Sequence, residues 1–244
     1  MVKGISKSIF NIKGKDAKFT FKASKVKNYV YKIVVKEEDA ASIIEEEKND
    51  LISGSDIKIS KPKLKYNIYY RVTGDFTQKY LVKKVFENGV SSQVDALLIG
   101  DEIFKPTKTK ISADSTETVT VVKIPAIELI SIEKDIDALI DGTHGQILGI
   151  IPNFIEQGRK SSKPDSWLDD NPIVMKIKPD KVDEYLGKIL SDKPKGAKRI
   201  VELNLTAKSV LRLIVPFYYF TLSSGSKKVK AKVNAVNGSI SIGK

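Results

Sequence analysis

Apolar and polar side chains alternate along much of the chain, and this period of two is the feature that most limits its fold. The alternation indicates an N-terminal hairpin with apolar positions Phe10, Ile12, Phe19 and Phe21, and it returns over residues 29–35 and 57–70. Side chains of a strand point alternately to opposite faces, so the pattern predicts sheets with one buried face. Because the 244 residues include no cysteine, this core must hold without disulfides.

Two segments change to the helical period. Residues 39–52 place apolar side chains on one face, after an acidic entry at 37–39 and before a stop at Ser53-Gly54. Residues 180–191 repeat this arrangement with Asp180 as the N-cap. We therefore expect an α+β fold with mainly antiparallel sheets, built from duplicated helix-plus-β-meander units, in which strand content exceeds helix content.

An internal repeat is the most specific pattern in the chain. Tyr69-Tyr70 precedes Asn88-Gly89 by nineteen residues, and Tyr218-Tyr219 precedes Asn237-Gly238 by the same nineteen. In each copy the tyrosine strand follows a predicted helix and precedes a predicted polar turn. The spacing indicates that the helix-plus-meander unit occurs twice.

Each copy, and a third partial copy, ends in a similar short pattern. In residues 141–147 and 234–240, an Asp or Asn is followed by any three residues, a Gly, any one residue and an Ile. Residues 85–91 have the same glycine but depart at the two ends, with Val85 and Ser91. A helix followed by an antiparallel meander with this ending resembles the PepSY-type module. The resemblance implies a non-catalytic binding or regulatory module, often near membranes or in the cell envelope.

The expected organisation has four consecutive parts. An N-terminal α+β unit covers residues 1–106, a partial middle repeat of strands covers 107–152, and a C-terminal helix-plus-meander unit covers 180–244. Residues 153–179 between them are rich in Gly, Ser and Pro and are expected to form a loop or linker. This segment holds the only tryptophan, Trp167, which is either an exposed anchor for a partner or, more commonly, a plug that ties the loop to the core.

Positive charge is concentrated at the two ends of the chain. Residues 1–30 carry a net charge of +7 and residues 215–244 carry +5, so the interior of this +12 chain is neutral. If the ends meet, a lysine-rich face would attract nucleic acid or another anionic surface. With only four arginines, nucleic-acid contacts would be to the backbone and independent of base sequence. The alternative is that the lysines simply solubilise the protein, and the composition is compatible with a thermophilic source.

These patterns predict a non-enzymatic binding or assembly protein that uses sheet faces or edges to contact a protein partner or a second copy. The alternatives are a non-sequence-specific nucleic-acid-binding protein and an enzyme with carboxylate-based chemistry. Core packing is the competing interpretation of the tyrosines, because alternate residues of a strand face inward. The candidate contact residues are Lys13, Lys15, Lys18, Lys22, Lys25, Lys27, Tyr69, Tyr70, Tyr218, Tyr219, Lys227, Lys228, Lys230 and Lys232.

His144 is the only histidine. The repeat aligns it with Asn237, and since both residue types tolerate a left-handed turn, a turn position is expected. The catalytic alternative is a general base oriented by Asp135, Asp137 or Asp141. No catalytic residue, metal ligand set or cofactor is predicted.

The chain shows no membrane or export signal. Its longest uncharged stretches are about fourteen residues, shorter than the roughly 20 that a membrane-spanning helix needs. The N-terminus lacks the apolar core of a signal peptide. A cytoplasmic protein without a transmembrane segment is therefore expected.

Overall fold

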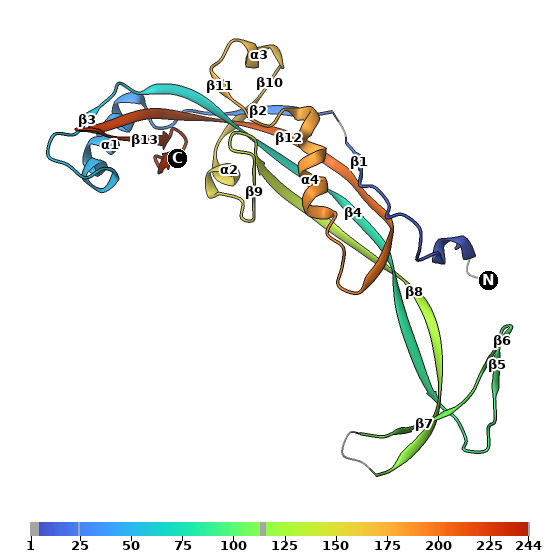
Figure 1. Cartoon of the computed structure of the whole chain (residues 1–244). Coiled ribbons are helices and arrows are strands. Elements are labelled where there is room, and N and C mark those ends of the chain that lie inside the picture. Colours follow the sequence, from blue (N-terminus) through green and yellow to red (C-terminus); the bar gives the residue numbers. More distant parts are fainter. Residues whose placement is uncertain (1–4, 24, 113–115, 244) are drawn as a thin grey trace. The chain divides into compact units, whose positions relative to one another are not determined.

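The computed structural model describes residues 5–23, 25–112 and 116–243 (Figure 1). Helix makes up 17% and strand 51% of the structure, so strand exceeds helix as the alternation predicts. Most strand pairs are antiparallel, and the fold is α+β.

The elements follow in chain order. The helices are α1 (Glu37–Leu51), α2 (Asn153–Gln157), α3 (Ser166–Asp169) and α4 (Val182–Leu190), with 3-10 helices at Lys7–Phe10 and Pro179–Lys181. The strands are β1 (Thr20–Lys22), β2 (Lys27–Tyr31), β3 (Lys58–Ile59), β4 (Lys63–Gly89), β5 (Leu97–Ile99), β6 (Glu102–Phe104), β7 (Thr107–Lys110), β8 (Thr118–Asp141), β9 (Gln146–Leu148), β10 (Lys160–Lys163), β11 (Ile173–Val174), β12 (Ala197–Ser224), β13 (Lys227–Asn234) and β14 (Ile240–Gly243).

Twelve of these strands form one mixed sheet. Its hydrogen-bonded order is β10-β2-β12-β4-β8-β7, and the remaining strands of the sheet pair at the sides of this path. β13 lies antiparallel between β12 and β14, whereas β2 pairs with β12, and β11 with β4, in the parallel direction. β5 and β6 pair only with each other, as a separate two-stranded sheet.

The chain divides into two compact units of three segments each. Unit 1 contains Met1–Thr20, Phe76–Lys134 and Leu190–Asn204. Unit 2 contains Phe21–Asp75, Asp135–Ile189 and Leu205–Lys244. The segments interleave because β4, β8 and β12 each have residues in both units, so the bounds differ from the four consecutive parts set out above.

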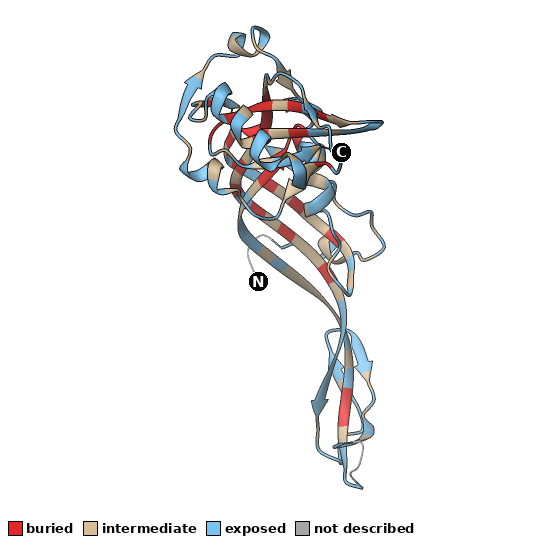
Figure 2. Cartoon of the chain, turned by 90° about the vertical axis from the view of Figure 1, so that its left-hand side faces the viewer, coloured by how far each residue is buried: buried red, intermediate tan, exposed pale blue. Residues whose placement is uncertain are grey.

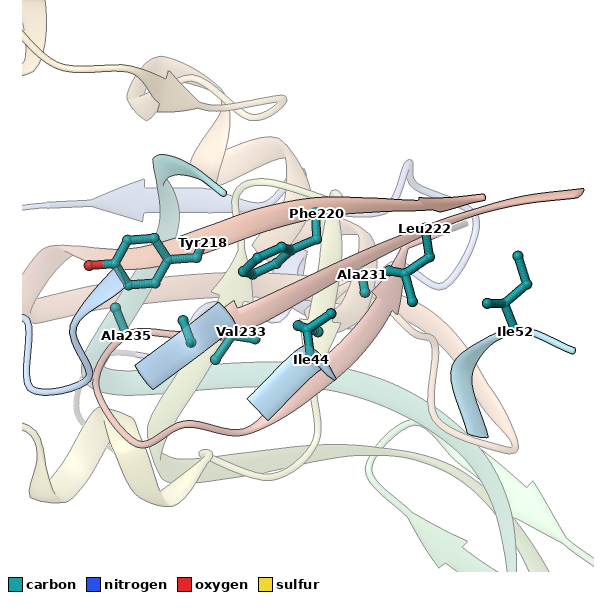
Figure 3. Packing of buried hydrophobic residues seen from close by; sticks show 9 residues of the cluster. Ile44, Ile52, Tyr218, Phe220, Leu222, Ala231, Val233 and Ala235 are labelled. Atoms are coloured by element: carbon teal, nitrogen blue, oxygen red, sulfur yellow. The ribbon is translucent and has the colours of Figure 1, made fainter. Parts of the chain in front are cut away.

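The core of unit 2 packs α1 against β12 and β13 (Figure 3). Ala40 and Ile44, one helical turn apart, are fully buried in the same cluster as Phe220 and Val233. The helix begins after Lys36, whose backbone N–H donates to the Asp39 carboxylate at 3.3 Å. The expected helix over residues 39–52 is confirmed with a start two residues earlier, and the expected C-terminal helix is confirmed as α4.

The N-terminal hairpin does not form. Residues 7–10 are a 3-10 helix, at whose start the Ser6 hydroxyl accepts the N–H of Ser8 at 3.3 Å. Arg199 holds the next segment by donating to the carbonyls of Asn11 at 2.8 Å and Lys15 at 3.0 Å. A Cβ on Gly14 would lie 2.7 Å from the Arg199 guanidinium carbon. Gly14 therefore admits a side chain from another segment instead of turning a hairpin.

The two tyrosine repeats adopt different local structures, so the structure does not show that one unit occurs twice. β4 continues without a break from Tyr69-Tyr70 to Asn88-Gly89, and the polar turn expected between them is absent from this fully described strand. In the second copy β12 ends at Ser224 and turns through Gly225, at φ +57°, into β13. Gly74 of β4 does not turn either, because a Cβ there would come within 2.3 Å of the Thr206 carbonyl. A glycine is needed at position 74 because the backbones of β4 and β12 approach each other closely there.

Residues 153–179 are tied to the sheet. β10 pairs with β2 through Ser161 and Val30, and β11 pairs with β4 through Ile173 and Tyr66. Trp167 on α3 is half-buried, with its ring edge-on to Tyr66 at a centroid distance of 5.1 Å. The plug interpretation of this tryptophan is therefore the one that the structure shows.

Candidate functional site

The aromatic residues expected to meet a partner lie in the core. Tyr69, Tyr70 and Tyr218 are at most 5% exposed. Buried residues form red bands along the strands in Figure 2. α1 covers the β12 face that carries Tyr218, and Tyr69 packs in the cluster on the opposite face, so both faces are closed here. These three side chains are packing residues. Only Tyr219 stays half-buried, and its hydroxyl donates to Oδ1 of Asn67 at 2.5 Å.

The candidate lysines are exposed except Lys232, which is half-buried. Lys13, Lys15 and Lys18 belong to unit 1, and the others belong to unit 2. Within unit 2, Lys27 lies beside Leu211 of β12, and Lys227 lies beside Ser224, thirteen residues further along the same strand. At roughly 3.3 Å per residue these points are about 40 Å apart. The lysines on β2 and those at the start of β13 therefore do not form one patch.

Unit 1 carries an exposed two-stranded hairpin. β5 and β6 join through Gly100-Asp101, where Gly100 has φ +61°, as a two-residue hairpin turn favours. Leu98 and Ile103 are direct cross-strand partners and are 69% and 71% exposed. A two-stranded hairpin alone is at best marginally stable in water. We name this pair, Leu98 and Ile103, the apolar knob.

A groove of about 730 Å³ lies in the same unit. Phe10, Val85, Ala126 and Ile127 give it an apolar lining. Val85 belongs to the last part of β4, residues 83–89, where side chains on both faces of the strand are exposed. We name this hollow the apolar groove. Its lining and the apolar knob expose apolar area in one unit, which is the usual mark of an interaction surface.

The hairpin is acidic, whereas the groove is mainly basic. Residues 95–104, which contain the hairpin, include three acidic residues and no basic one. Lys7, Lys83 and Lys84 line the groove together with one acid, Glu102 of β6, and Lys84 pairs with Glu128 at 3.3 Å. Residues 76–134 together carry eight lysines and eight acidic residues in a chain of net charge +12. Copies of this segment can therefore meet without net repulsion.

His144 lies in the turn between β8 and β9, as expected. Oδ1 of Asp141 accepts the backbone N–H groups of Thr143 at 2.8 Å and His144 at 2.9 Å, and Oδ2 lies 2.7 Å from Nδ1 of His144. Gly145, at φ +76°, takes the left-handed conformation that was expected of the histidine. The structure thus contains a carboxylate–imidazole pair fixed by a tight turn.

The other two acids proposed to orient His144 have different partners. Arg71 donates two hydrogen bonds to Asp137, at 2.9 and 2.6 Å, and Lys208 pairs with Asp135 at 3.1 Å. Within residues 5–23, 25–112 and 116–243, no three acidic or histidine side chains lie close enough together to share a metal ion.

Sequence reasoning did not single out Leu98 and Ile103. Their segment has runs of consecutive apolar residues, Leu97-Leu98-Ile99 and Ile103-Phe104, which read like buried strands. The pattern does not show whether other strands cover them. The signal that could have identified them is the short length of the two strands. Three-residue strands around an acidic Gly-Asp turn cannot build a core of their own.

Comparisons of the chain with models of known families, with curated proteins and with solved structures gave no match. The resemblance to PepSY-type modules therefore stays a prediction. Among the residues that the structure describes, none of the helices has the length and apolar character needed to cross a membrane.

Proposed function

We propose that this chain is a non-enzymatic assembly protein, in which the apolar knob of one copy occupies the apolar groove of a second copy. The observation that carries the proposal is the pairing of Leu98 with Ile103 at about 70% exposure, on a hairpin whose two strands pair only with each other among the described residues. The acidic hairpin and the lysines of the groove favour another copy of the same chain as the partner.

A comparison of the free energy gained by burying the knob with the cost of association shows which other contacts the interface needs. Full burial of a Leu or Ile side chain contributes about 1.5 to 3 kcal/mol, so covering the exposed part of both contributes about 2 to 4 kcal/mol. Association itself costs about 4 kcal/mol or more in lost freedom of motion. The knob alone therefore cannot hold two copies together. Contacts of Val85, Ala126 and Ile127, and of the acids with the lysines, must supply the remainder.

Sedimentation velocity over a range of protein concentrations tests the proposal. We expect the wild-type chain to associate reversibly and the double variant Leu98→Thr/Ile103→Thr to weaken association about 30- to 1,000-fold, the equivalent of 2 to 4 kcal/mol. Ile242→Thr is the matched control, since Ile242 is 57% exposed but lies on β14 of unit 2. A wild-type chain that stays monomeric, or a double variant that associates as well as the control, would contradict the proposal.

A further inference from the structure

A second hollow, of about 190 Å³, lies in unit 2 beside His144. His144, Tyr219, Lys230 and Lys232 are among its lining residues. Lys230 and Lys232 are two residues apart on β13 and share one face of the strand, and Lys232 is the direct cross-strand partner of Tyr219. We name this hollow the His144 cavity.

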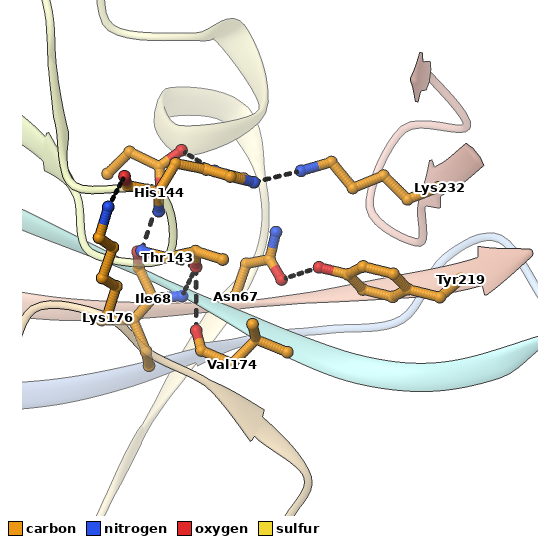
Figure 4. Close-up of polar contacts among 9 residues, drawn as sticks. Asn67, Ile68, Thr143, His144, Val174, Lys176, Tyr219 and Lys232 are labelled. Carbon is orange, nitrogen blue, oxygen red and sulfur yellow. Dashed lines mark hydrogen bonds and ion pairs between the residues drawn. The ribbon is translucent and has the colours of Figure 1, made fainter. Parts of the chain in front are cut away.

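The side chains of Lys232 and His144 meet at the wall of the cavity. Nζ of Lys232 lies 3.4 Å from Nε2 of His144 (Figure 4). The Asp141 carboxylate beside Nδ1 assigns the ring proton to Nδ1, so Nε2 accepts from the ammonium. Burial lowers the pKa of Lys232, and the charge of Asp141 opposes this only in part. Burying a lysine side chain to this extent is a cost that a bound anion would offset.

The charge of Asp141 offsets the positive charge of this wall only in part. Its two carboxylate oxygens already receive three donors, from the backbone of Thr143 and from the backbone and ring of His144. Lys176 adds another positive charge nearby, since its Nζ donates to the carbonyl of His144 at 3.4 Å. The side chains that line the cavity itself include two lysines and no acid.

We propose that the His144 cavity binds a phosphate group, as inorganic phosphate or as a phosphomonoester. The two lining lysines match the charge of about −1.5 to −2 that a phosphomonoester carries at pH 7. Lys230 and Lys232 both present their ammonium groups to the cavity from β13. Two ammonium donors on one wall suit an oxyanion with several acceptor oxygens.

His144 provides the test, because it is the only histidine and its imidazole C–H signals in a proton NMR spectrum need no assignment. The full chain is titrated with inorganic phosphate at pH 7, with chloride holding the ionic strength constant. We expect a saturable shift of the His144 signals, tenfold or more weakening in Lys232→Met, and about threefold weakening in Lys230→Met. Lys228→Met is the matched control, since Lys228 is exposed on the same strand and does not line the cavity, and its titration should match the wild type.

Other outcomes overturn the proposal. A shift that does not saturate, or one that is equal in the wild type and Lys232→Met, would show that phosphate does not occupy the His144 cavity. An equal response to acetate would contradict a phosphate site. If Lys232→Met loses the amide dispersion of the wild type, Lys230→Met decides the matter, because Lys230 is exposed and its substitution leaves the core intact.

Discussion

Thr143 is the residue on which the turn that holds His144 depends. Its hydroxyl oxygen accepts the N–H of Ile68 at 2.9 Å and donates to the carbonyl of Val174 at 3.0 Å, in a nearly fully buried position. Thr143→Val keeps the shape and removes the hydroxyl, so one buried backbone donor and one buried acceptor lose their partner. Each such group costs about 1 to 3 kcal/mol. We therefore expect the free energy of unfolding to fall by about 3 to 4 kcal/mol.

Thr143→Ser is the matched control, because it keeps the hydroxyl and removes one methyl group, which costs about 1 kcal/mol. Urea unfolding, followed by the fluorescence of the single tryptophan, Trp167, measures both variants. The expected gap between them is about 2 to 3 kcal/mol. If Thr143→Val unfolds within 0.5 kcal/mol of Thr143→Ser, the hydroxyl does not carry the turn and the reasoning is refuted.

Two further predictions concern the core and the cavity of unit 2. Ile44→Ala should lower the free energy of unfolding by about 2 to 5 kcal/mol, because Ile44 is fully buried beneath β13; a loss below 1 kcal/mol in urea unfolding would contradict this packing. The pKa of Lys232 is below its ordinary 10.5 in the folded chain, so the unfolded chain binds more protons between the two values and stability rises with pH there. Wild-type stability relative to Lys232→Met should therefore increase from pH 7 to pH 10.5, and a difference independent of pH would count against burial of the charge.

The two longest helices could be predicted from the sequence because their signals are local. Each has an acidic first turn and apolar residues spaced along one face, and each was found within two residues of its expected start. The turn at Asp141 and His144 could be predicted for the same reason, since the two residues are three positions apart and Gly145 follows them directly.

The features that could not be predicted depend on contacts distant in sequence. Gly14 looks like a hairpin turn, but Arg199 from β12 approaches it and holds the chain in another conformation. Gly74 looks like a break in a strand, but it allows the backbone of β12 to come close. The alternating pattern around Tyr69 and Tyr218 predicts strands with one buried face. In the structure both faces of the sheet are covered at these residues. Each case needs the partner segment, which the local pattern does not identify.

The central claim is that the apolar knob of one copy enters the apolar groove of another, and cross-linking tests it most directly. The chain has no cysteine, so Ile103→Cys and Ala126→Cys can be made in separate chains, mixed and mildly oxidised. A disulfide forms only where the two Cα atoms come within about 7 Å. A linked dimer of the two different variants should form faster than the dimer of Ala126→Cys with the control Ile242→Cys. Equal yields of the two pairs would contradict it.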